Sequence, residues 1–158
     1  MKKFELTSEF VTFLGKKLFR IKALVSFGDV KEGELGGLVE KEENLDQSGN
    51  AWVSGNAWVS GDARVYGDAR VYGNAWVSGD ARVQNCRDYS ATSCFGSGNR
   101  TTTFFRTKDG GISVRCGCFY GTLAEFREKV KERHGGRRLA KEYLMLADLM
   151  EFRLSKDE

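Results

Sequence analysis

A six-residue pattern of small, aliphatic and polar positions occupies the middle of the chain. Residues 49–84 consist of six units, GNAWVS, GNAWVS, GDARVY, GDARVY, GNAWVS and GDARVQ. Within each unit Ala and Val stand two residues apart, so in an extended chain they point to the same side, and the Trp or Arg between them points to the other. The Gly-Asn or Gly-Asp pair that opens each unit suits a corner of the backbone. The segment is an internal repeat of short strands and corners.

The length of the unit favours parallel coils over antiparallel hairpins. Only three or four residues remain for a strand once the corner is subtracted, whereas typical strands run to about five or six. The units resemble the left-handed hexapeptide family of parallel β-helices, in which three hexapeptides make one triangular coil. The resemblance implies two coils, in which residues 18 apart stack: Trp52 on Arg70, Trp58 on Trp76, and Arg64 on Arg82.

The outward side chains of these coils suggest a surface for association. Trp52, Trp58 and Trp76 all point outward in this arrangement, and a stack of two coils has two open ends. Exposed aromatic patches often mark interfaces, so we expect an oligomer or partner face on these tryptophans and a homo-oligomer, trimeric or dimeric. The alternative is that these outward side chains are only exposed to solvent and form no interface. The buried valines should hold the coils together, so aspartate at Val65 or Val71 should unfold the repeat.

Many hexapeptide β-helices are acyltransferases, and this activity is not expected here. The acyltransferases of that family use a histidine as general base and several coils to form the cofactor groove. The only histidine of the chain, His134, lies far outside the repeat. Without a base near the groove, the proton of an acceptor group cannot be removed. We therefore expect a protein that is not an enzyme.

The residues before the repeat are predicted to form a cap. Apolar and polar residues alternate through residues 2–24 around a turn at 15–17, which is typical of a β-hairpin. Further turns follow at 28–37, and an acidic run at 40–46 leads into the repeat. We interpret residues 1–48 as a β-hairpin cap on the β-helix.

A different pattern begins after Asn85. Segments 89–94, 101–107 and 112–119 are predicted strands, the last two joined by a hairpin turn, and Cys116 and Cys118 should share a face of the third. Thr122 and Glu125 form a capping box that starts a helix ending at His134, and a second helix is expected from about 138 to 152. The predicted fold class is β-rich α+β: a hairpin cap (1–48), a short left-handed parallel β-helix (49–84) and a small β-β-β-α-α module (85–158).

Composition excludes several classes of protein. Apolar residues make up 41% of the 158 residues, which is too many for wholesale disorder. No run approaches a membrane span or a signal peptide, so we expect a cytoplasmic protein that does not bind membranes. The four cysteines are expected to be free thiols. They lack paired CxxC spacing and there is one histidine, so we expect no metal and no cofactor.

The distribution of charge indicates that the last segment is a ligand-binding module. The net charge is +3, and after residue 84 there are 14 Lys and Arg beside 10 Asp and Glu, so an anionic partner should bind there. The amides of the glycine-rich loop 96–98 can cradle an anion, and a stacking aromatic can hold a base. We expect the ligand to be lined by Asn99, Arg100, Thr101, Thr103, Arg106, Arg115, Phe119 and Arg138. Truncation of Arg106 should weaken binding and leave folding intact.

Part of this module resembles a family of phage proteins. The residues concerned are GSGNRTTTFFR at 96–106, CGCF at 116–119, GTL at 121–123 and KERHG at 131–135. They are similar to the Thoeris anti-defence proteins, which sequester an immune signal of the cyclic ADP-ribose type. The resemblance implies a sponge in the host cell cytosol that binds a cyclic nucleotide or cyclic ADP-ribose-type molecule without cleaving it.

Two other functions remain open from the sequence. One is a structural or assembly protein that binds another protein through the Trp and Arg ladders of the β-helix. The other is a nucleic-acid-binding adaptor that uses the basic residues at 129–141. Acidic residues interrupt that cluster, so binding of nucleic acid is the less favoured of the two.

Overall fold

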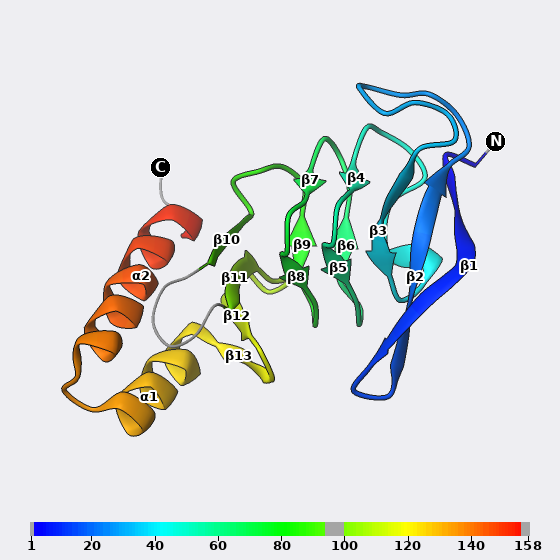
Figure 1. The fold of residues 1–158 in the computed structure, drawn as a ribbon. Coiled ribbons are helices and arrows are strands. Elements are labelled where there is room, and N and C mark those ends of the chain that lie inside the picture. The colour runs from blue at the N-terminus through cyan, green and yellow to red at the C-terminus, as the bar shows by residue number, and fades with distance from the viewer. Residues whose placement is uncertain (1, 94–99, 156–158) are drawn as a thin grey trace.

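The structure, a computed structural model, describes residues 2–93 and 100–155 (Figure 1). The elements follow one another along a single direction, from a β-hairpin at the N-terminal end through the repeat to two helices at the other end. The repeat therefore lies between two flanking units. This order brings segments from all three predicted regions onto common surfaces.

The N-terminal hairpin continues directly into the repeat. Strands β1 (Phe4–Phe13) and β2 (Lys16–Ala23) pair antiparallel, with Leu14 and Gly15 in the turn at positive φ, one residue earlier than predicted. β3 (Leu35–Val39) pairs antiparallel with β2 and parallel with β5 of the repeat. The predicted cap is therefore part of the same five-stranded sheet as two strands of the repeat.

The repeat forms two coils with parallel pairing, as predicted. Its strands are β4 (Trp52–Val53), β5 (Trp58–Val59), β6 (Arg64–Val65), β7 (Arg70–Val71), β8 (Trp76–Val77) and β9 (Arg82–Val83). The parallel pairs β4–β7, β5–β8 and β6–β9 join residues 18 apart. All six alanines and all six valines of the units are at most 1% exposed, so they form the interior of the coils.

An irregular coil precedes Gly49. Leu38 and Val39 of β3 pair with β5, and Leu45 forms a parallel bridge to Val65. Between them lies the short 3₁₀-helix η1 (Glu42–Asn44), where the buried Asn44 amide donates to the Gly61 and Ala63 carbonyls. The coil pattern therefore begins upstream of residue 49, where the sequence repeat starts.

The C-terminal unit has four strands rather than three. β10 (Tyr89–Ser93), β11 (Thr101–Arg106), β12 (Ile112–Cys116) and β13 (Phe119–Thr122) form an antiparallel sheet in that order. The predicted strand 112–119 is interrupted because Gly117 takes a φ of 60° and turns the chain. Cys118 therefore lies exposed in the turn, whereas Cys116 is buried, and the predicted β-β-β-α-α order is corrected to β-β-β-β-α-α.

The four-stranded sheet separates the coils from the helices. Phe105 and Tyr89 belong to the core of the coils, while Phe104 and Val114 pack with α1 (Leu123–His134) and α2 (Arg138–Leu154). Neighbouring residues of β11 thus point into different cores, as the alternation of a strand requires. Because this sheet covers one end of the coils and the hairpin sheet the other, the open ends that suggested self-association are not present among the described residues.

Three further expectations concern chemistry and location. Cys86, Cys116 and Cys118 are free thiols, as expected, and Cys94 lies outside the described residues. Within the described chain, no group of three or more potential ligands is arranged to hold a metal ion. None of its helices has the length and apolar character that crossing a membrane requires.

Candidate functional site

Two of the predicted ligand residues have structural roles instead. Thr103 is buried, and its hydroxyl accepts a hydrogen bond from the backbone N–H of Trp76 (3.0 Å). Arg106 forms an ion pair with Asp88 (2.8 Å) and donates to the carbonyl of Leu154 (2.6 Å), the last residue of α2. These internal contacts engage the polar groups of both residues, so the structure gives them structural roles and we leave them out of the candidate site.

Four of the predicted lining residues border two neighbouring pockets. These are Arg100, Thr101, Arg115 and Phe119. Arg138 is exposed at the start of α2 and lines neither pocket. Asn99 and the glycine-rich loop 96–98 lie outside the described residues.

The predicted tryptophan face is also corrected. Trp52 is only 1% exposed, because Phe27 of the loop before β3 packs edge-on against its ring (5.4 Å). Trp58 and Trp76 are half-buried and meet edge-to-face at 4.9 Å, with Phe13 of the hairpin within 5.2 Å of both rings. Only two of the three tryptophans therefore contribute to an accessible surface.

The first pocket, called the helix pocket here, lies between the β12–β13 turn and the two helices. Its volume is about 480 Å³, within the range of sites for small molecules. Aromatic rings from four elements, β1, β13, α1 and α2, form much of its wall: Phe13, Phe119, Phe126 and Tyr143. Phe126 packs edge-on against Tyr143 (5.8 Å) and tilted against Phe119 (5.9 Å), so these rings hold one another in place.

The rim of the helix pocket is positively charged. Arg100, Lys129, Arg133 and His134 line it, and none of its described lining residues is acidic. His134 stacks on Tyr143 (5.8 Å), and its Nδ1 is buried with no hydrogen-bond partner in the part of the chain that the structure describes. Lys129 has an acidic neighbour, Glu132, at 3.9 Å, a distance that leaves its ammonium group available. The pocket can therefore accept an anion beside an aromatic surface.

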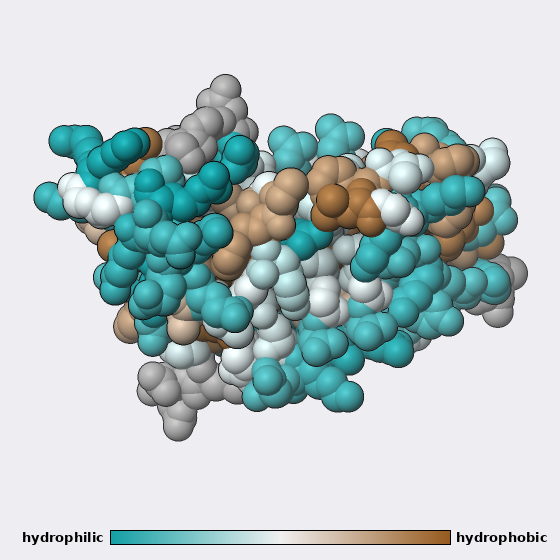
Figure 2. All heavy atoms as spheres, turned by 90° about the horizontal axis from the view of Figure 1, so that it is seen from below, coloured by the Kyte–Doolittle hydropathy of each residue, from teal (hydrophilic) through white to brown (hydrophobic). Residues whose placement is uncertain are grey.

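The second pocket, called the tryptophan groove here, lies between the hairpin, the coils and the β12–β13 turn. Its volume is about 590 Å³, and Trp58, Trp76 and Arg115 line it together with Phe13 and Arg100. The Arg115 guanidinium lies over the Trp76 ring at 3.6 Å, a cation–π contact, and its Nε is buried without a hydrogen-bond partner. Burial lowers the pKa of Arg115 from its ordinary value. Figure 2 shows that apolar surface forms a band across one face of the molecule, between hydrophilic regions.

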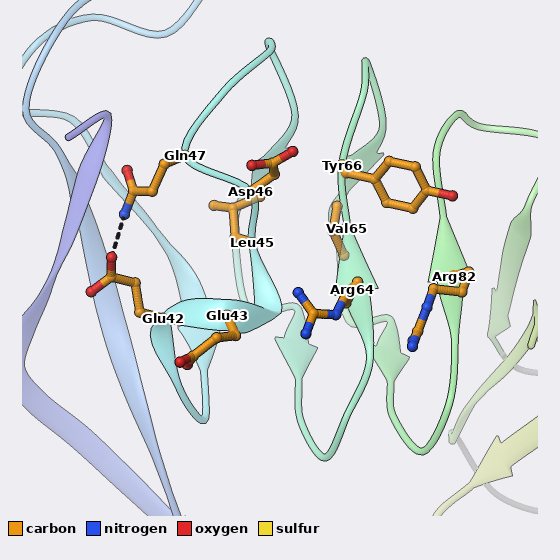
Figure 3. A pocket seen from close by; sticks show the side chains of 9 residues that line it. All are labelled: Glu42, Glu43, Leu45, Asp46, Gln47, Arg64, Val65, Tyr66 and Arg82. Carbon is orange, nitrogen blue, oxygen red and sulfur yellow. Dashed lines mark hydrogen bonds between the residues drawn. The ribbon is translucent and has the colours of Figure 1, made fainter. Parts of the chain in front are cut away.

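A third pocket on the coils has mixed charge (Figure 3). Arg64 and Arg82 of neighbouring coils line it together with the acidic residues Glu42, Glu43 and Asp46. Glu42 accepts a hydrogen bond from Gln47 (3.1 Å), and Arg82 donates to the backbone carbonyl of Asp62 (2.9 Å). Since charges of both signs meet here and several are already paired, this pocket is less suited to an anion than the helix pocket.

Sequence reasoning missed the residues of α1 and α2 in the helix pocket. Lys129 and Arg133 are four residues apart and therefore lie on one face of α1, next to Phe126 and Val130. That spacing was the available signal in the sequence. The acidic residues between the basic residues at 129–141, however, are also typical of the solvated end of a helix. Tyr143 of α2 lines the pocket and also belongs to the core between the sheet and the helices.

Comparison with known proteins supports the solenoid alone. The model of the YdcK β-solenoid repeat family matches residues 63–79, which include strands β6, β7 and β8. No curated protein matches the chain. The fold thus defines a β-solenoid of two coils, closed at one end by a hairpin sheet and at the other by a four-stranded sheet with two helices.

Proposed function

We propose that the protein binds an anionic, nucleotide-derived small molecule in the helix pocket and sequesters it without converting it. One observation carries the proposal: Arg100, Lys129, Arg133 and His134 surround an aromatic pocket of about 480 Å³ that no described acidic residue lines. A phosphate needs charge-assisted donors, and a base needs an aromatic surface on which to stack. The helix pocket offers both within one cavity.

The biological role follows from the resemblance of residues 96–135 to the Thoeris anti-defence proteins. In this proposal the protein is a phage-type sponge in the host cell cytosol that removes an immune signal of the cyclic nucleotide or cyclic ADP-ribose type. The coils then act as a scaffold, and we assign them the left-handed sense of the hexapeptide family. The positive rim and the aromatic wall support the ligand class, because both suit a nucleotide.

The test is calorimetry against a panel of ligands. The panel contains AMP, GMP, cyclic dinucleotides and cyclic ADP-ribose isomers, and a sponge should bind one of them with a Kd of about 1 nM to 1 µM. Arg133→Ala should weaken that binding roughly 10- to 100-fold, the cost of one charge-assisted contact. Arg137→Ala, three residues after the end of α1 and outside the pocket, is the matched control and should leave the affinity unchanged.

The bound ligand should be recovered chemically intact after prolonged incubation. Hydrolysed or transferred products would show that the protein is an enzyme instead. If no member of the panel binds, or if Arg133→Ala and Arg137→Ala weaken binding equally, the proposed site is wrong. Affinity that grows steadily with the length of a single-stranded oligonucleotide would favour the nucleic-acid adaptor.

A further inference from the structure

The helix pocket and the tryptophan groove are adjacent. Three residues line both of them: Phe13, Arg100 and Gly117. Phe13 comes from the hairpin, Arg100 immediately precedes β11, and Gly117 lies in the β12–β13 turn. The two cavities therefore meet at a common border formed by one ring, one guanidinium group and a residue without a side chain.

We propose that the two cavities are subsites of a single site for a dinucleotide, with one base in each subsite and the linking phosphate beside Arg100. This inference rests on the proposed function of the helix pocket. It extends that function by assigning a second base-binding surface, made of Trp58, Trp76 and Arg115.

Arg100 is positioned for the shared phosphate. It is exposed, and it makes no hydrogen bond or ion pair with any residue in the described ranges. Its side chain lies over Gly117, where an added Cβ would stand 3.3 Å from its Cδ. A larger residue at position 117 would therefore push Arg100 away from the border between the subsites.

Arg115 and Trp76 provide the second subsite. The guanidinium of Arg115 lies over the Trp76 ring and 5.5 Å from the centre of the Tyr120 ring, yet its Nε has no hydrogen-bond partner among the described residues. A guanidinium held in this way retains donors for a phosphate, and the exposed part of the half-buried Trp58 ring offers a stacking surface for a base beside the Arg115 guanidinium that covers Trp76. The other guanidinium group of this region, that of Arg20, is already bound to Glu9 (2.9 Å) and to the Gly36 carbonyl (2.7 Å).

Charge also favours a ligand that spans both cavities. None of the described residues lining the tryptophan groove is acidic, as in the helix pocket. Four cations in the two subsites form no ion pair shorter than 3.9 Å with any described residue: Arg100, Arg115, Lys129 and Arg133. A mononucleotide fills one cavity and leaves the other hydrated, whereas a dinucleotide contacts both, and the second contact is then intramolecular.

The experiment compares AMP with the linear dinucleotide pApA by calorimetry and by tryptophan fluorescence. We expect pApA to bind roughly 100-fold more tightly than AMP, which is the gain typical of linking two contacts. Arg115→Met retains the packing against Trp76 and should reduce the affinity for pApA to that for AMP, without changing the affinity for AMP. Arg133→Ala should weaken both ligands. Only pApA should quench the fluorescence of Trp58 and Trp76.

The outcomes separate this inference from the function on which it rests. If AMP and pApA bind equally and Arg115→Met has no effect, the second subsite is wrong while the helix pocket stands. If neither binds, both proposals fail. Tighter binding of each longer oligonucleotide would show a nucleic-acid groove and would also overturn the dinucleotide site. Circular dichroism and thermal unfolding of Arg115→Met check that the variant is folded.

A second, independent observation concerns the outer face of α2. Met145, Leu149 and Phe152 are 71%, 55% and 84% exposed and stand at i, i+4 and i+7, so they form one apolar stripe. The exposed residues Arg138 and Lys141 precede the stripe. Asp148 and Glu151 lie beside its C-terminal half, where the two carboxylates share the single guanidinium of Arg127 of α1 (2.7 Å each), so an excess of negative charge remains. In an antiparallel pair of α2 helices, the basic end of one copy meets the acidic half of the other.

This complementarity points to a homodimer formed by α2 against α2 of a second copy. Sedimentation should show a dimer at protein concentrations of about 10 to 100 µM, the range in which a small interface is expected to associate. Phe152→Glu should give a monomer, whereas Leu35→Glu, which changes an exposed leucine at the other end of the molecule, should not. A wild-type monomer throughout this range, or a dimer that survives Phe152→Glu, would exclude the α2 interface.

Discussion

The backbone N–H of Trp76 donates a hydrogen bond to the hydroxyl of Thr103, 3.0 Å away on β11. In the preceding coil the corresponding backbone N–H of Trp58 donates to the Ala75 carbonyl (2.9 Å). The equivalent N–H groups of that coil likewise donate to backbone carbonyls of the next coil. After Trp76 there is no further coil. The Thr103 side chain therefore replaces the missing carbonyl and ends the ladder of hydrogen bonds.

Replacing Thr103 by valine should destabilise the protein by about 1–3 kcal/mol, the cost of leaving a buried N–H without a partner. Thr103→Ser retains the hydroxyl and should cost less. Urea unfolding followed by circular dichroism measures both variants. A larger loss for serine than for valine would mean that the methyl group, and not the hydrogen bond, is the important part of Thr103.

Replacing Arg106 by alanine should destabilise the protein by about 3–5 kcal/mol, because the largely buried Asp88 loses its cation and the end of α2 loses a donor. This expectation reverses the one drawn from the sequence, which assigned Arg106 to the ligand. Arg138→Ala removes an exposed guanidinium and is the matched control. Thermal unfolding distinguishes the two, and similar transition temperatures for both variants would contradict the structural role of Arg106.

Sequence was sufficient where the structure is periodic or local. The spacing of Ala and Val predicted the pairing of residues 18 apart, because a repeated unit repeats its contacts. The capping box was also confirmed: Glu125 N–H donates to the Thr122 hydroxyl (3.1 Å), and Thr122 N–H donates to the Glu125 carboxylate (2.8 Å). Both features depend on residues whose relative positions the local geometry determines.

Contacts between distant segments could not be predicted in the same way. Arg106 binds the carbonyl of Leu154, 48 residues away, and no pattern in the chain identifies that partner. The alternation of β12 continues through Gly117, so the turn there was missed until the positive φ was known. The helix pocket likewise needs Arg100, which precedes β11, and Arg133 from α1, which only the packing of α1 on the sheet brings together.

Replacing Val71 by aspartate should unfold the coils, with a loss of more than about 4 kcal/mol, because the side chain is fully buried and a carboxylate there has no partner. The adjacent Tyr72 is 62% exposed, so Tyr72→Asp places the same charge one residue away in solvent and should be tolerated. Far-ultraviolet circular dichroism and proteolysis compare the two variants. A folded Val71→Asp protein would contradict the assignment of the valines to the interior.

Lys3 should make stability increase with pH between 8 and 10. Its ammonium group is buried and donates to the carbonyls of Ala51 (2.7 Å) and Gly49 (3.3 Å), while burial lowers its pKa from 10.5 to about 8, against the attraction of Asp46. Between these two values the unfolded state binds more protons than the folded state, so the free energy of unfolding rises with pH. The gain from pH 8 to pH 10 should be about 1–2 kcal/mol.

Above pH 10 the trend should reverse, because burial raises the pKa of Tyr89 to about 12 and only the unfolded state then loses that proton. Urea unfolding at pH 8, 9 and 10 measures the rise. Lys3→Met has no ammonium group to discharge and should show no rise in this interval; an equal rise in both proteins would assign the effect to other groups.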